Sequence, residues 1–106
     1  MKFRVAKTKE ADKDFNDLSK ENQELLEEDY KNIHKKGIKS VLTKSLDTGL
    51  FEIKTKHLRS LYGYKKDQII LVAVIFVKDG QKTPKEFIKR TKKILKNHDA
   101  LVGDIL

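Results

Sequence analysis

The sequence predicts an α+β fold of element order β-α-α-β-β-β-α, in which an antiparallel sheet carries an N-terminal helical hairpin and a C-terminal helix. Three observations predict it: apolar residues at helical spacing between residues 9 and 36, strand-like segments joined by short turns between residues 50 and 78, and an amphipathic segment over residues 84–97. A length of 106 residues is ordinary for one domain, so we expect residues 1–106 to form a single domain.

The N-terminal third predicts one strand and two helices. Phe3–Lys7 alternates apolar and polar side chains, as a short strand does. From about residue 9 the apolar residues recur at spacings of three and four, and Ser19 is a suitable N-cap within that stretch. We therefore expect a helical hairpin of about 9–18 and 20–36, with Gly37 ending the second helix in the left-handed αL conformation.

The central third predicts three consecutive antiparallel strands. A loop ending at Gly49 leads into Leu50–Lys56, whose side chains alternate in character, and Arg59–Lys66 follows after a short connection. A turn at 66–68 leads into Ile69–Lys78. This last strand is apolar on both faces, which predicts a central position in the sheet.

The last predicted helix spans residues 84–97. Pro84 stands near its start, where the missing proline N–H does no harm, and Thr83 is predicted to cap it. The helix is amphipathic. Its apolar stripe consists of Phe87, Ile88, Thr91, Ile94 and Leu95, and its basic stripe of Lys85, Lys89, Lys92, Lys93 and Lys96.

The charge of the chain narrows the choice of partner. Lysine and arginine number 24 against 16 aspartate and glutamate residues, which gives a formal net charge of +8. Such an excess costs self-repulsion, and a polyanionic partner is the usual reason to tolerate it. A merely soluble basic surface and an anionic membrane surface are the alternatives, although no basic amphipathic terminus supports the membrane.

Several classes of site and location are not expected. The chain has no cysteine, which excludes disulfides, thiolate zinc sites and a cysteine nucleophile. The three histidines have no spacing typical of a metal site, so neither a metal nor another cofactor is expected. No apolar leader segment stands out, and the longest apolar run, Ile69–Val77, is too short to cross a bilayer as a helix. We therefore expect a cytoplasmic protein.

The most informative spacing is in the first strand of the central third. Alternate residues of a strand share one face of the sheet, and the ends of adjoining strands lie close together. We therefore expect one carboxylate to lie close to as many as five cations. They are Glu52, Lys54, Lys56, Arg59, Lys78 and Lys82.

Such a surface suits RNA cleavage by internal attack. A base takes the proton of the 2′-OH, cations hold the scissile phosphate as it gains negative charge, and an acid protonates the leaving 5′-oxygen. Arg59 would offer paired donors to a phosphate, and clustered cations can make a lysine a workable acid or base near neutral pH. The alternative is an ordinary solvated face of an antiparallel sheet, on which Glu52 simply pairs with a neighbouring cation.

Five residues are candidates for binding RNA. A histidine at a strand end could exchange protons beside Arg59, although a surface role is more common. Tyr62 and the second tyrosine of that strand project opposite Arg59, where they either pack in the core or stack on bases. The lysines of the last helix either follow an RNA backbone or are merely solvated. The candidates are Lys56, His57, Tyr64, Lys85 and Lys89.

The C-terminal half carries a specific resemblance. Gly49-Leu50-Phe51-Glu52-Ile53-Lys54 is followed by Arg59-Ser60-Leu61-Tyr62, by an apolar strand ending in Phe76-Val77-Lys78, and by Gln81-Lys82-Thr83-Pro84 with a lysine-rich helix. This series, roughly residues 42–97, resembles the phage-derived HigB-type branch of the RelE/ParE toxin superfamily of type II toxin–antitoxin systems. The element order predicted above is also that of this family.

The resemblance implies a function and partners. Family members enter the ribosomal A site and cut mRNA, which inhibits translation. HigB-type toxins are commonly neutralised by a HigA-like helix-turn-helix antitoxin. The resemblance therefore implies a metal-independent endoribonuclease (mRNA interferase) whose partners are the ribosome, mRNA and an antitoxin in a hetero-oligomeric complex. By position, the implied catalytic residues are Glu52, Lys54, Arg59, Lys78 and Lys82.

The sequence departs from the family pattern at three places, one of which is the presence of Ser60 and Gly63 within the second strand of the central third. Lys54 stands where the pattern has arginine, which weakens paired hydrogen bonding to a phosphate, and Asp79-Gly80 follow Lys78 where the pattern has a second lysine. Two other functions remain open. A double-stranded RNA-binding domain is also basic and has an αβββα core, but it leaves the first strand and the helical hairpin unexplained. A non-enzymatic phage regulatory protein that binds a protein partner is the second.

Overall fold

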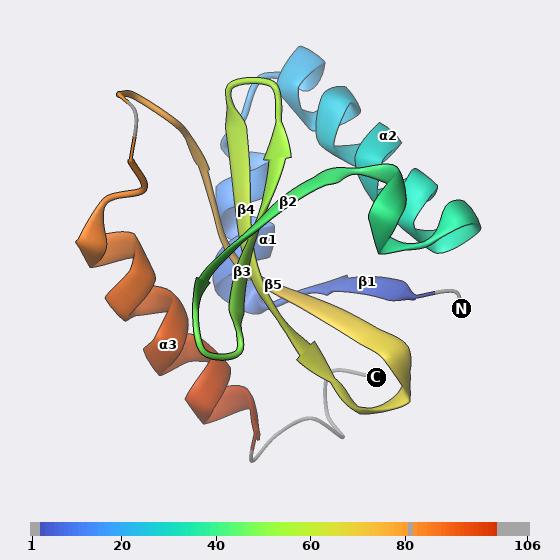
Figure 1. Ribbon diagram of the computed structural model, residues 1–106. Helices are drawn as coiled ribbons and strands as arrows, with labels where there is room; N and C mark the ends of the chain where they lie inside the picture. The colour runs from blue at the N-terminus through green and yellow to red at the C-terminus, as the bar shows by residue number, and fades with distance from the viewer. Residues whose placement is uncertain (1–2, 81, 100–106) are drawn as a thin grey trace.

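A five-stranded sheet separates two layers of helix in the computed structural model, which describes residues 3–80 and 82–99. Helices α1 (Lys9–Asn16) and α2 (Lys20–Lys36) lie on one face of the sheet, and α3 (Lys85–Asp99) lies on the other (Figure 1). This α+β architecture confirms the predicted fold class. The strands are β1 (Arg4–Lys7), β2 (Leu42–Asp47), β3 (Leu50–Thr55), β4 (Leu58–Lys65) and β5 (Ile69–Val77).

The N-terminal helical hairpin forms where its capping residues place it. The Thr8 hydroxyl accepts a hydrogen bond from a first-turn amide of α1, and the Ser19 hydroxyl accepts one from the amide of Asn22, as predicted for Ser19. Gly37 ends α2, and its N–H donates to the carbonyl of Ile33. Its conformation, φ 94° and ψ 173°, is not the predicted αL state, because the chain turns directly into a 3-10 turn at Ile38–Ser40.

The strands run in the order β1-β5-β4-β3-β2. Strands β2 to β5 are antiparallel neighbours, whereas β1 pairs in parallel with β5, with Arg4 opposite Ile69. The prediction of an antiparallel sheet is therefore right for β2–β5 and wrong for β1. Strand β5 lies between β1 and β4 and is buried along both faces except at Val77, which agrees with its apolar sequence.

Strand β2 corrects the predicted element order to β-α-α-β-β-β-β-α. Leu42–Asp47 was expected to lie in a loop, because no apolar alternation marks it as a strand. In the structure, Leu46 is the only residue of this strand that is not exposed. The segment becomes a strand by pairing with β3, with Leu42 opposite Lys54. It forms the edge of the sheet, where few of its side chains are covered.

Two apolar layers hold the helices to the sheet. On the face covered by α1 and α2, here called the hairpin face, Leu26 and Ile33 pack against Ile53 and Tyr62. On the opposite face, here called the α3 face, the predicted apolar stripe of α3 packs against β4 and β5. No helix in residues 3–80 and 82–99 is long and apolar enough to span a membrane.

A glycine allows α3 to approach β4 closely. A Cβ atom at Gly63 would lie 2.9 Å from Cδ1 of Leu95 and 3.3 Å from the carbonyl oxygen of Gly49. The ring of Phe87 stacks on that of Phe76, with centroids 4.3 Å apart, at the other end of the helix. These contacts place the start of α3, and the connection that precedes it, beside the end of β5.

Candidate functional site

Strands β3 and β4 bring three predicted site residues together on the α3 face. Ile53 points into the hairpin-face core, so its neighbours Glu52 and Lys54 point to the α3 face, as predicted from alternation. Lys54 is paired across the strands with Arg59 of β4. Cross-strand partners carry their side chains on the same face and in contact range. The predicted convergence of these three residues is therefore observed.

Glu52 is a buried carboxylate held from two sides. Its side chain is only 1% exposed, and Nε of Arg59 lies 3.9 Å from Oε2. The other oxygen, Oε1, accepts a hydrogen bond from the hydroxyl of Thr83. Thr83 was predicted to cap α3, but the helix begins at Lys85 and the Thr83 hydroxyl is bonded to Glu52 instead. Sequence reasoning missed this contact, and only the position of Thr83 in the Gln-Lys-Thr-Pro element could have pointed to it.

The guanidinium of Arg59 is fixed to the backbone of its own strand and turn. Nη1 donates to the carbonyl oxygens of Lys56, at 2.6 Å, and Leu58, at 2.8 Å. Nε is buried and has no hydrogen-bond partner among the described residues, and the side chain is 13% exposed. A planar cation held in this way keeps a fixed direction, which suits recognition of a phosphate.

Lys78 and Lys82 lie on the segment that crosses from β5 to α3. The amide of Lys78 donates to the carbonyl of His57 at 2.8 Å, which closes the end of β5 against the β3–β4 turn. Lys78 is two residues beyond Phe76, which packs on the α3 face, so alternation directs it to the same face. Lys82 is exposed and directly precedes Thr83. Gln81 of the Gln-Lys-Thr-Pro element lies outside the described residues.

One cation of this surface was not predicted. Lys44 of β2 is the cross-strand partner of Glu52 and therefore shares its face. It was missed because β2 was expected to be a loop. The basic face, as we use the term below, consists of Lys44, Lys54, Arg59, Lys78 and Lys82 around the buried Glu52.

Three of the predicted RNA-binding residues lie apart from the basic face. Lys56 belongs to the β3–β4 turn, with φ 53°, and not to the strand that was expected to extend to it. Nε2 of His57 is 2.9 Å from Oδ1 of Asn22, which directs the ring toward α2. Tyr64 packs edge-on against Phe51 on the hairpin face, so base stacking together with the basic face is not possible for it.

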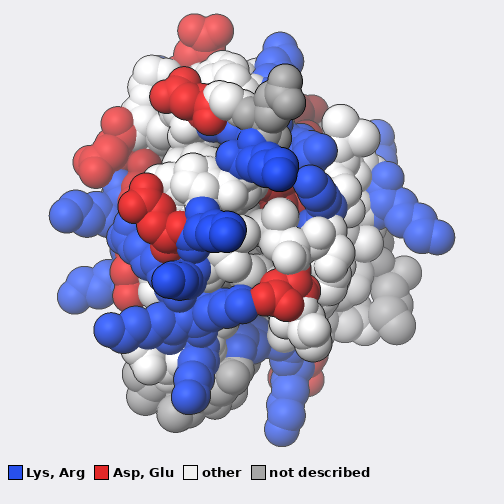
Figure 2. Space-filling view, turned by 60° about the vertical axis from the view of Figure 1, so that its left-hand side comes forward, with Lys and Arg blue, Asp and Glu red and all other residues white. Residues whose placement is uncertain are grey.

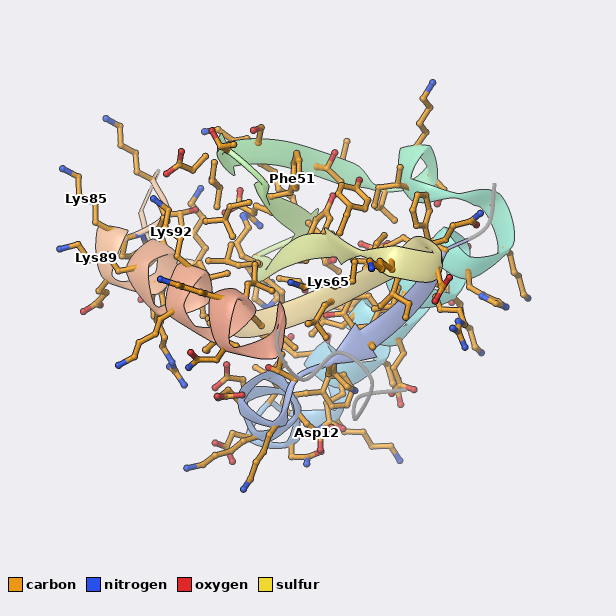
Figure 3. All side chains as sticks on the ribbon, turned by 90° about the horizontal axis from the view of Figure 1, so that it is seen from below. Asp12, Phe51, Lys65, Lys85, Lys89 and Lys92 are labelled. Atoms are coloured by element: carbon orange, nitrogen blue, oxygen red, sulfur yellow. The ribbon has the colours of Figure 1, made fainter. Side chains whose placement is uncertain are left out.

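The lysines of α3 extend the positive surface. Lys85 and Lys89 are exposed and project outward from the first turns of the helix (Figure 3). Lys92 forms an ion pair with Asp47, the last residue of β2, and its hydrogen bond lowers the pKa of Asp47. Figure 2, which turns α3 toward the viewer, shows blue lysine and arginine side chains outnumbering red acidic ones on this side. The described residues include no cluster of three or more His, Asp or Glu side chains that could hold a metal ion.

Comparison with known sequences identifies a family. The profile of the family described as "Phage derived protein Gp49-like" matches residues 13–96. This range contains every residue of the basic face and Thr83. Curated proteins give no match.

Solved structures with a similar fold include three RelE proteins. The toxin–antitoxin complex RelBE2 of Mycobacterium tuberculosis has a chain that is 14% identical, with 74% of this chain and all of that chain covered and a TM-score of 0.61. For the RelE–RelB complex of Pyrococcus horikoshii the identity is 17%, the coverage 76% and 100%, and the TM-score 0.60. The isolated Escherichia coli RelE toxin is 16% identical, with 85% of this chain and 98% of that chain covered and a TM-score of 0.56. The chain therefore has a RelE-like fold.

Proposed function

Because the chain belongs to the phage-derived Gp49-like family, we propose that it is the toxin of a type II toxin–antitoxin system, of HigB type, and that it cleaves mRNA on the ribosome. The RelE-like fold supports the proposal at the level of architecture. The observation that carries it is the pairing of Lys54 with Arg59, whose guanidinium is held in one direction, on a face that Lys44 shares and that Lys78 and Lys82 adjoin. Such a face offers several cations to a single phosphodiester.

The proposed reaction is an internal transfer within the RNA. The 2′-oxygen attacks the adjacent phosphorus, the bond from phosphorus to the 5′-oxygen breaks, and the products carry a 2′,3′-cyclic phosphate and a 5′-hydroxyl. A base on the enzyme removes the 2′-proton and an acid returns a proton to the 5′-oxygen. Arg59 stabilises the phosphate as its negative charge grows, and the neighbouring lysines are the candidates for the base and the acid. Glu52 is too deeply buried to take the 2′-proton directly.

The partners follow from the proposed activity. The substrate is mRNA in the ribosomal A site, with Lys85 and Lys89 beside the basic face as further contacts to RNA backbone. A HigA-like helix-turn-helix antitoxin would neutralise the toxin in a hetero-oligomeric complex. Two of the similar structures are toxin–antitoxin complexes, which supports an antitoxin partner. The proposal places the protein in the cytoplasm, acting as one unit over residues 1–106 and without a metal ion.

A reconstituted translation reaction tests the proposal. We expect the purified protein to cut an mRNA only while ribosomes translate it, and Lys54→Ala to reduce the cutting. Lys31→Ala is the matched control, because Lys31 is an exposed lysine of α2, which covers the opposite face. Equal cutting by both variants would show that the basic face is not the site.

The same reaction distinguishes the alternatives. Protection of any duplex RNA without cutting would support a double-stranded RNA-binding protein. The fold argues against that reading, because the helical hairpin and the parallel strand β1 are integral to the sheet and its core. Growth arrest on expression that no substitution in the basic face relieves would indicate a non-enzymatic interaction protein.

A further inference from the structure

We propose that Thr83 is a positioning residue for Arg59 and acts through the carboxylate of Glu52. The inference rests on the proposed function, since Arg59 is the group that would hold the phosphate. Glu52 is 1% exposed and has no route to a bound RNA, so its influence passes through the side chains that it contacts. Those contacts are Arg59 on one oxygen and Thr83 on the other.

The Thr83 hydroxyl sets the orientation of the carboxylate. The last torsion of a glutamate side chain joins an sp³ to an sp² carbon and has broad energy wells, so one contact alone does not fix the two oxygens. With Oε1 of Glu52 accepting from Thr83, Oε2 is directed to Nε of Arg59 at 3.9 Å. Without the hydroxyl, the carboxylate can rotate away from the guanidinium.

Rotation of the carboxylate would release one side of the guanidinium. The Nη1 end is held by the carbonyl oxygens of Lys56 and Leu58, and the Nε side faces Glu52. No hydrogen bond of Nη2 occurs within the described part of the chain, so this nitrogen is the one that we expect to meet a ligand. The directional fork of Arg59 is useful to a transition state only while its plane is held, because small misplacements are costly for catalysis.

The location of Thr83 makes it suited to this task. It belongs to the connection between β5 and α3, and the Pro84 carbonyl after it accepts from the amide of Phe87 at 3.1 Å, within the start of α3. The helix start therefore fixes the position of the Thr83 hydroxyl above the sheet. Lys82 directly precedes Thr83, so the hydrogen bond from Thr83 to Glu52 also places the backbone of Lys82 close to Glu52.

Substitutions that remove or keep the hydroxyl test the inference. We expect Thr83→Val to lower the single-turnover rate of mRNA cutting by about tenfold or more, the effect of losing one hydrogen bond to a charged group. Binding of a non-cleavable RNA should change by less than about threefold, because the cations remain. Thr83→Ser should retain nearly the full rate. Thr91→Val is the matched control, because Thr91 is buried and its hydroxyl bonds only within α3, to the carbonyl of Phe87.

The effect must also depend on Arg59. In a protein that already carries Arg59→Lys, the added Thr83→Val substitution should reduce the rate by less than about twofold, since coupled residues are not additive. If valine disturbs the connection before Pro84, Thr83→Ala removes the same hydroxyl with a smaller side chain and carries the same expectation.

Two outcomes overturn the inference alone. One is a folded Thr83→Val and Thr83→Ala pair that cuts at the wild-type rate, and the other is an undiminished loss in the Arg59→Lys protein. A wild-type protein that does not cut mRNA on translating ribosomes overturns the proposed function, and the inference with it, so the two failures are distinguishable.

Discussion

Substitution of Arg59 should destabilise the protein through the carboxylate that it leaves behind. Glu52 is 1% exposed, and removing Arg59 takes away the cation 3.9 Å from its Oε2. Loss of one partner of a buried ion pair costs more than the pair contributes, because the remaining charge stays out of water. The prediction is that Arg59→Ala is strongly destabilising in the wild type and much less so when Glu52 is already glutamine.

The magnitude follows from the distance and the burial. At an effective dielectric constant of about 20, unit charges 3.9 Å apart attract each other by about 4 kcal/mol. Truncation to alanine admits water to Glu52, so the loss from the unpaired charge should be about 2–3 kcal/mol. The two hydrogen bonds from Nη1 of Arg59 add about 1 kcal/mol in either background. We therefore expect a loss of about 3–4 kcal/mol for Arg59→Ala, and a coupling with Glu52→Gln of about 2 kcal/mol.

Urea unfolding followed by circular dichroism measures both quantities. The four proteins needed are the wild type, Arg59→Ala, Glu52→Gln and the double variant. The double variant should be more stable than Arg59→Ala alone and yet inactive in mRNA cutting, which separates folding from function. A coupling free energy within error of zero would contradict this prediction, because it would mean that Glu52 and Arg59 do not interact in the folded protein.

Three smaller predictions concern the scaffold. Gly63→Ala should lower the free energy of unfolding in urea by about 1–3 kcal/mol, because the new Cβ would lie 2.9 Å from Cδ1 of Leu95 and 3.3 Å from the backbone oxygen of Gly49. An unchanged urea concentration at the unfolding midpoint would contradict this close approach. The hydrogen bond from Lys92 lowers the pKa of Asp47 in the folded protein. The pair therefore contributes stability above the unfolded carboxyl pKa of about 3.9, and this contribution is lost as the pH falls through the lower folded pKa. Asp47→Asn should remove this part of the decrease in the free energy of unfolding at acidic pH. Burial raises the pKa of Tyr30, so its contribution to stability is complete below the unfolded pKa of about 10 and is lost as the pH rises through the higher folded pKa. In an alkaline absorbance titration, Tyr30 should therefore ionise only when the protein unfolds. An ionisation step at about pH 10 that Tyr30→Phe removes would contradict this.

Most of the fold was accessible from the sequence because its apolar pattern is strong where elements are buried. Strand β5 and the apolar stripe of α3 are covered by their neighbours, so their periodicity predicts them directly. Strand β2 was not predicted, because an exposed edge strand needs no apolar alternation. Its pairing with β3 depends on the folded structure and not on a local sequence pattern. The parallel pairing of β1 with β5 joins residues 65 apart in the chain, which no local pattern specifies.

The candidate site shows the same division between local and long-range information. Alternation along β3 placed Glu52 and Lys54 correctly, and the short turn brought Arg59 beside them. The burial of Glu52 was not predictable, because a carboxylate in an alternating strand is usually solvated. Its partner Thr83 is 31 residues away, on a connection whose path depends on where α3 docks.

The central claim, that the basic face holds the RNA, can be tested by amide chemical-shift mapping. The ligand is an RNA oligonucleotide with a 2′-O-methyl group at each position, which cannot undergo internal attack. We predict changes in the amide resonances of Lys54, Arg59, Lys78, Lys82 and the first turn of α3, with little change along α2. Shifts concentrated on α2 and β1, with the basic face unaffected, would contradict it.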